Sequence, residues 1–142
     1  MSPSYYHAYI CSKLRVAFNT LEEYMVYSEL TLQIQGKDYV PDIALYPKRP
    51  IDFTAEDIVK MTEMPVLIVE VLSPTQAAQE ILGKFHSYFD AGIQSCWLVI
   101  PISTSVIVYS AMNKAQVCKI GDIVDPVLDI RIALDAIFGQ CA

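Results

Sequence analysis

The sequence has no segment that would carry it to or across a membrane. No apolar run approaches the roughly 20 residues of a membrane-spanning helix. The first residues, MSPSYYHAYICSK, do not have the charged-then-apolar order of a secretory signal. The sequence therefore predicts a soluble, cytoplasmic protein.

Cysteine pairs and basic clusters are also missing. The four cysteines are widely separated with no CxxC pair, which argues against a zinc knuckle or a redox dithiol, and we expect free, mostly buried thiols. Ten basic residues stand against sixteen acidic ones, and no stretch concentrates lysine or arginine. This balance argues against a protein that holds nucleic acid by a basic stripe. A carboxylate site with a divalent cation escapes part of that argument, because the metal offsets the negative charge.

What the sequence does contain is ample material for one core. Its 142 residues are 54% hydrophobic, and there is no internal repeat, low-complexity segment or linker. We therefore expect a single domain over residues 1–142. Apolar periodicity and turn residues predict helices over residues 5–25, 55–62 and 73–91, strands over 28–35, 39–46, 66–72, 95–100 and 106–109, and a strand passing into a helical turn over 127–138.

Two carboxylates stand out against this background. Glu70 interrupts the apolar run of residues 66–72, where an uncompensated charge would be costly, so it needs a hydrogen bond, an ion pair, a metal or an opening to solvent. Asp42 follows Pro41 at the start of a predicted strand and could equally be an ordinary turn residue. Two carboxylates from neighbouring strands are the hard oxygen ligands that Mg²⁺ prefers.

Several motifs around these residues resemble one known family. In order along the chain they are VPDIA at 40–44, VEVLSPT at 69–75, Lys84, YFDAGI at 88–93 and WLV at 97–99. Their order and spacing resemble the Uma family of restriction endonuclease-like proteins, known from cyanobacteria, over roughly residues 2–138. The family belongs to the PD-(D/E)XK nuclease superfamily. The resemblance implies an α/β fold in which helices flank a central mixed β-sheet.

The resemblance also implies a site. Asp42 and Glu70 would be metal ligands for Mg²⁺ or Mn²⁺, and the carbonyl of Val71 would add a third. The superfamily's lysine commonly follows the second carboxylate by two residues, where this chain has Leu72. The family places it on the next helix, where Lys84 matches and would stabilise charge on the transferring phosphoryl group.

Two further residues are secondary candidates. Glu80 precedes Lys84 by one helical turn and would be either a catalytic helper or the partner of a solvated salt bridge. His7 stands where relatives often carry histidine, although a lone histidine on an apolar helix is more commonly a packed residue. Glu22 and Glu23 could replace an acid on the first helix of the superfamily, but adjacent glutamates usually form a solvated face.

Two functions follow as hypotheses. The first is a Mg²⁺-dependent endonuclease that hydrolyses DNA phosphodiester bonds, expected as a homodimer because both strands of a duplex must be cut. The second is a truncated, inactive relative that keeps the fold as an interaction or regulatory module. This second hypothesis rests on the acidic net charge and on a difference from the family. Many relatives begin with an extra N-terminal hairpin before the segment that matches Ser2, and that hairpin would carry an acidic residue of the site that this sequence lacks.

Overall fold

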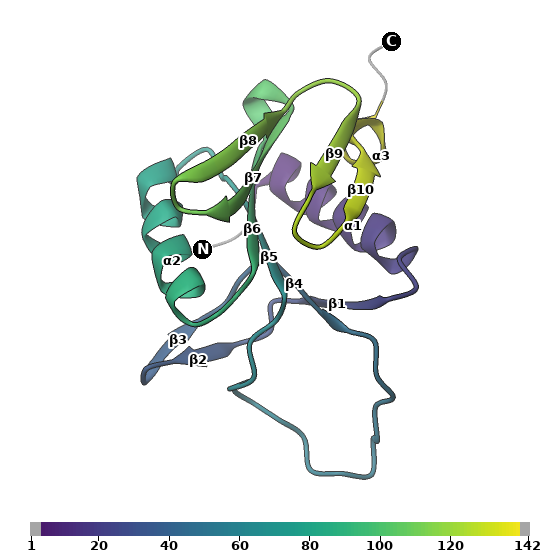
Figure 1. Cartoon of the computed structure of the whole chain (residues 1–142), viewed down its shortest axis with the longest axis vertical. Coiled ribbons are helices and arrows are strands. Elements are labelled where there is room, and N and C mark those ends of the chain that lie inside the picture. Colours follow the sequence, from purple (N-terminus) through teal and green to yellow (C-terminus); the bar gives the residue numbers. More distant parts are fainter. Residues whose placement is uncertain (1–3, 140–142) are drawn as a thin grey trace.

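The computed structural model describes residues 4–139 and organises them around a six-stranded mixed sheet (Figure 1). The strand order is β1-β4-β5-β6-β7-β8, in which β5 and β6 run parallel and the other neighbours antiparallel. In chain order the elements are α1 (Tyr5–Asn19), β1 (Tyr24–Ser28), β2 (Leu32–Ile34), β3 (Lys37–Tyr39), β4 (Ile43–Pro47), β5 (Leu67–Val71), α2 (Ala78–Asp90), β6 (Ser95–Ile100), the 3-10 helix η1 (Pro101–Ser103), β7 (Ser105–Ala111), β8 (Lys114–Cys118), β9 (Asp122–Asp125), β10 (Ile130–Ala133) and α3 (Leu134–Phe138). The predicted fold class is confirmed.

The two long helices cover opposite faces of this sheet, with α1 on one side and α2 on the other (Figure 1). The small antiparallel pair β9–β10 and the helix α3 lie on the α1 side and share its core. On the other side α2 buries Ile81, Phe85 and Tyr88, while Leu82 and Phe89 are partly buried. No helix within residues 4–139 is long and apolar enough to span a bilayer.

The central strand β5 is buried along its whole length, as its apolar sequence predicted. Successive side chains of a strand point to opposite faces. Leu67, Val69 and Val71 pack in the core beneath α1, and Ile68 packs in the core beneath α2. Glu70 is two residues from Ile68, so its side chain faces α2.

The first helix is shorter than predicted. It ends at Asn19, and Tyr24 and Met25 belong instead to β1, which pairs with β4. The run YMVY has the aromatic and β-branched composition of strands, so pairing with β4 outweighs continuation of the helix. The strand predicted over residues 28–35 is shorter in the structure. Ser28 is the last residue of β1, and β2 comprises only Leu32–Ile34.

The helix predicted over residues 55–62 is wrong. The connection between β4 and β5 is irregular, and every residue from Pro47 to Lys60 is exposed. Just before the predicted helix, the N–H of Thr54 donates to Asp52 Oδ1 at 2.9 Å in a local turn. A helix this short is marginal unless it buries an apolar face, and this segment packs none.

The second long helix begins later than its predicted start at Ser73. Leu72 still belongs to the sheet, since its N–H donates to the Val99 carbonyl at 2.9 Å. The chain then turns, with the Gln76 N–H donating to the Ser73 carbonyl at 3.1 Å, and α2 starts at Ala78. The chain must leave the sheet layer before a helix can pack on it, which displaces the start by about one turn.

The C-terminal part mixes confirmed and missed elements. The strands β6 and β7 pair antiparallel as predicted, and the strand β10 passes into α3 as predicted for residues 127–138. The edge strand β8 was missed because four of its five residues are exposed, leaving little apolar alternation. Cys11, Cys96 and Cys118 are free and buried, as expected, whereas Cys141 lies outside the described residues.

Candidate metal and catalytic site

Glu70 is a carboxylate enclosed at the end of β5, with 5% of its surface exposed. Its Oε1 accepts the backbone N–H of Asp42 at 3.1 Å, and its Oε2 accepts the hydroxyl of Tyr88 at 3.2 Å. Burial, followed by the charge of Asp42, raises the pKa of Glu70 to about 7, whereas the ammonium of Lys84 opposes the rise. Glu70 therefore holds its proton to a higher pH than an exposed glutamate does.

Asp42 stands directly before β4 and is tied to the same strand end. The antiparallel register pairs Ile43 with Val69, so its continuation by one residue sets Asp42 opposite Glu70. The N–H of Val71 donates to Asp42 Oδ2 at 2.8 Å, and the N–H of Asp42 donates to Glu70. The two acidic residues thus come from neighbouring chain segments, and each carboxylate accepts a backbone N–H from the other's segment.

Pro41 accounts for this unusual exchange. Continuing the register by a second residue places Pro41 opposite Val71. Proline has no N–H, so it cannot donate to the Val71 carbonyl as an ordinary strand residue would. Regular pairing stops here, and the carboxylate of Asp42 takes the N–H of Val71. The Val71 carbonyl therefore faces a position that offers no backbone donor.

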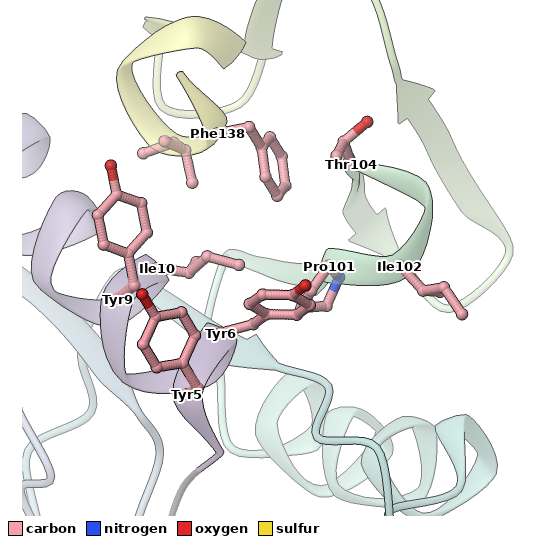
Figure 2. Close-up of a pocket in the computed structure, with 9 residues that line it drawn as sticks. Tyr5, Tyr6, Tyr9, Ile10, Pro101, Ile102, Thr104 and Phe138 are labelled. Atoms are coloured by element: carbon pink, nitrogen blue, oxygen red, sulfur yellow. The ribbon is translucent and has the colours of Figure 1, made fainter. Parts of the chain in front are cut away.

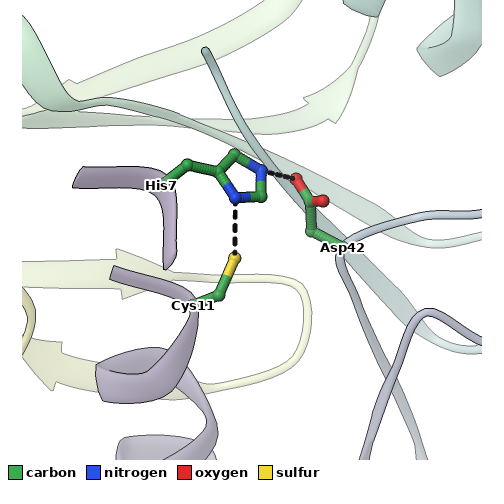
Figure 3. Close-up of side chains that lie close together, drawn as sticks. All are labelled: His7, Cys11 and Asp42. Carbon is green, nitrogen blue, oxygen red and sulfur yellow. Dashed lines mark hydrogen bonds and ion pairs between the residues drawn. The ribbon is translucent and has the colours of Figure 1, made fainter. Parts of the chain in front are cut away.

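The first helix contributes His7 and Cys11 to this region (Figure 3). His7 Nε2 lies 3.1 Å from Asp42 Oδ2, and Cys11 Sγ lies 3.7 Å from His7 Nδ1. Because a carboxylate only accepts hydrogen bonds, Nε2 carries the proton toward Asp42. Burial, and then the charge of Asp42, raises the pKa of Cys11 to about 12, so Cys11 is a thiol at neutral pH. In the neutral imidazole Nδ1 accepts that S–H.

Lys84 approaches the carboxylates from α2. Its side chain is half-buried, and its positive charge is near enough to Glu70 to lower the pKa of that carboxyl. No ion pair within 4.0 Å involves Lys84 among residues 4–139, so its ammonium is not neutralised by a direct carboxylate contact. Tyr88, one helical turn further on, is fully buried and holds Glu70 by its hydroxyl.

The other acidic candidates lie apart from this cluster. Glu80 is exposed in the first turn of α2, where a negative charge suits the helix N-terminus. It is not among the charges that shift the pKa of Glu70, and no ion pair joins it to Lys84 within the described chain. Glu22 and Glu23 are exposed beyond the end of α1. The structure brings together Asp42, Glu70, Val71, Lys84 and His7.

An apolar groove runs beside the cluster, between the start of α1 and the turn after β6. Figure 2 shows the rings of Tyr5, Tyr6 and Tyr9 on one side, with Pro101 and Phe138 facing them. The groove measures about 540 Å³. A smaller hollow of about 330 Å³ shares part of this lining and extends to Leu72, Ser73 and Pro74, just beyond Val71 on the chain.

Sequence reasoning did not single out two members of the cluster, Tyr88 and Cys11. Tyr88 follows Lys84 by four residues, so the two share one face of α2, and this spacing is the signal that could have placed Tyr88 beside Glu70. Cys11 follows His7 by four residues, so the two share one face of α1. That His-x-x-x-Cys spacing is the signal that could have paired them.

The sheet, its flanking helices and the carboxylates at the end of β5 define a protein with a restriction-endonuclease-like nuclease fold. A solved structure described as a "putative nuclease belonging to DUF820", from Anabaena variabilis, matches with a TM-score of 0.82 and 21% identity, covering 97% of this chain and 83% of the other. The chain belongs to the Uma2 family, described as "Putative restriction endonuclease", whose model matches residues 1–134. This confirms the family resemblance seen in the sequence. Comparison with curated proteins finds no match.

Proposed function

We propose that this protein is a Mg²⁺-dependent endonuclease that hydrolyses DNA phosphodiester bonds, with Asp42, Glu70 and Lys84 as its catalytic residues. The observation that carries the proposal is the pairing of Asp42 with Glu70 at the end of β5, where one carboxylate is buried and has a raised pKa. Buried carboxylates with perturbed pKa values concentrate at functional sites. Membership of the Uma2 family supports the same activity.

The residues present fit a divalent cation, Mg²⁺ or Mn²⁺. Asp42 and Glu70 would supply carboxylate oxygens, and Val71 would supply the carbonyl that faces Pro41. These are the hard oxygen donors that Mg²⁺ selects. A cation would also relieve the repulsion between the two carboxylates, which contributes to the raised pKa of Glu70. Bound there, it would polarise a phosphate and lower the pKa of a coordinated water.

The remaining side chains have roles that follow from their contacts. Lys84, which makes no direct ion pair within residues 4–139, would stabilise charge on the phosphoryl group in the transition state. Tyr88 holds Oε2 of Glu70, and His7 holds Oδ2 of Asp42, so both carboxylates are oriented in advance. In the protonated form of Glu70 the carboxyl is a poorer ligand, so binding of the cation should displace that proton.

A homodimer acting on duplex DNA in the cytoplasm completes the proposal. Two copies would place one active site at each strand of the duplex, so both strands could be cut in one binding event. A single site would cut only one strand at a time. The net charge of -6 favours a competing function, that of an inactive interaction module, because acidic surfaces repel the DNA backbone.

Nicking of supercoiled plasmid in Mg²⁺ or Mn²⁺ tests the proposal. The wild-type protein should convert plasmid to nicked and linear forms, and Asp42→Ala, purified identically, should not. Lys84→Ala should lower the rate by about 100- to 1,000-fold, the usual effect of removing one transition-state donor. Lys60→Ala, which changes an exposed lysine on the loop between β4 and β5, is the matched control and should cleave normally. Equal nicking by wild type and Asp42→Ala would identify a contaminant and favour the interaction module.

A further inference from the structure

Three side chains with different donor atoms meet at the start of α1. His7 and Cys11 lie one turn apart on the helix face that approaches Asp42 (Figure 3). One donor atom from each of the three residues lies within 4.8 Å of the other two. We propose that His7, Cys11 and Asp42 form a transition-metal site, selective for ions such as Zn²⁺ or Co²⁺ over Mg²⁺, that shares only Asp42 with the carboxylate site.

The selectivity follows from the donor atoms. Mg²⁺ takes oxygen ligands and keeps much of its water. Imidazole nitrogen and thiolate sulfur instead favour Zn²⁺, Co²⁺ and related ions. A histidine, a cysteine and a carboxylate are three protein ligands, which leave a fourth tetrahedral position for water or substrate, as in catalytic rather than structural zinc sites.

The surroundings favour a preformed site. Cys11 is 8% exposed, and the side chains of His7 and Asp42 are 14% and 19% exposed, so the donors are largely but not completely sheltered from water. The N–H of Val71 holds Asp42 Oδ2 at 2.8 Å, and the buried Leu14 anchors α1 one turn beyond Cys11. The donors therefore have little freedom to lose when an ion binds.

The same contacts have a competing explanation that needs no metal. The thiol of Cys11 can donate to His7 Nδ1 while His7 Nε2–H donates to Asp42, which pairs all three groups. The two explanations differ in the protonation state of the Cys11 sulfur. When a divalent ion binds, the S–H bond of Cys11 breaks, its proton passes to the buffer and a sulfur–metal bond forms. In the hydrogen-bonded chain the sulfur keeps its proton.

Titration of the full-length protein with Co²⁺ distinguishes them, because cobalt bound to a thiolate gives a charge-transfer absorption band that oxygen ligands do not. The wild type should develop this band to one equivalent, and Cys11→Ser should lose it. Loss of a partner outside the ligand shell already weakens metal binding by about 10- to 100-fold, so Cys11→Ser should bind Co²⁺ at least that much more weakly. Cys118→Ser, at another buried cysteine with the same 8% exposure, is the matched control and should keep the band.

Two additions separate this site from the proposed nuclease site. Glu70→Gln should keep the cobalt band, since Glu70 is not a ligand here, whatever its effect on plasmid nicking. A large excess of Mg²⁺ should leave the band intact, and Zn²⁺ should bleach it. If Cys11→Ser is not folded by circular dichroism, His7→Ala should weaken Co²⁺ binding and shift the band. A wild type without the band, a band that survives in Cys11→Ser, or a band removed by Mg²⁺ would overturn the proposal.

Discussion

Replacing Glu70 with glutamine removes a buried charge while preserving the shape of the side chain. The amide oxygen can still accept the N–H of Asp42, and the amide nitrogen can donate to the hydroxyl of Tyr88, which is able to accept. The substitution therefore isolates the effect of ionisation. It should stabilise the protein at pH 8 and leave stability nearly unchanged at pH 4.

The magnitude follows from the pKa of Glu70, which folding raises from 4.5 to about 7. Below pH 4.5 the carboxyl is protonated in the folded and unfolded chains alike, so it has no effect. As the pH rises to about 7 the unfolded carboxyl ionises while the folded one keeps its proton, and the folded state loses stability. The loss is complete above the folded pKa and amounts to about 3 kcal/mol.

Urea unfolding at pH values from 4 to 8 measures this difference. The single tryptophan, Trp97, is fully buried and provides the fluorescence signal. The free energy of unfolding of Glu70→Gln, relative to wild type, should rise across the window and level off above pH 7. Glu56→Gln, at an exposed position in the loop between β4 and β5, is the control. Its free energy of unfolding should show the same pH dependence as that of the wild type. If the free energy of unfolding of Glu70→Gln also shows the pH dependence of the wild type, the assignment of a raised pKa to Glu70 is refuted.

Three further predictions concern charge, hydrogen bonding and packing. Lys84→Met should move the pH-dependent loss of stability to higher pH, because its ammonium lowers the pKa of Glu70; an unchanged midpoint would place Lys84 too far away to act on the site. Asp125→Ala should destabilise by roughly 3 kcal/mol or more in urea, since the buried carboxylate accepts from Trp97 Nε1 at 2.9 Å and from two backbone N–H groups, and a loss under 1 kcal/mol would contradict this account. Leu14→Ala, at a fully buried position of α1, should cost about 2 to 5 kcal/mol by calorimetry, and a neutral result would show that α1 is not part of the main core.

Local patterns were sufficient to predict the central elements. The sequence correctly predicted β5, with its one carboxylate, and the antiparallel neighbours β6 and β7. Strands buried on both faces are rich in apolar residues, so they can be recognised from composition. The helix predicted over residues 55–62 had no surface to pack on, which only the tertiary structure decides. The late start of α2 has the same origin, since Leu72 pairs with β6 before the helix can begin.

The sequence named residues that the structure brings together in the candidate site, but not the contacts that join them. The cost of burying Glu70 identified it as a residue that needs partners, and the family motif pointed to Asp42. The exchange of backbone hydrogen bonds between the two depends on how Pro41 interrupts the register of β4 and β5, which no local pattern encodes. The hydroxyl of Tyr88 and the thiol of Cys11 were missed because a buried aromatic residue and a buried cysteine are usually only packing residues.

Isothermal titration calorimetry of Mn²⁺ and Mg²⁺ binding tests the central claim, that Asp42 and Glu70 jointly hold a divalent cation. Wild-type protein should bind with saturation and release protons near pH 7, because cation binding lowers the raised pKa of Glu70. Asp42→Ala and Glu70→Gln should each abolish that binding, whereas Cys11→Ser should retain the Mg²⁺ signal because its sulfur is no ligand for Mg²⁺. Wild-type protein that shows no saturable heat with either ion, or equal binding by Glu70→Gln, would contradict the claim and leave Glu70 as a structural residue.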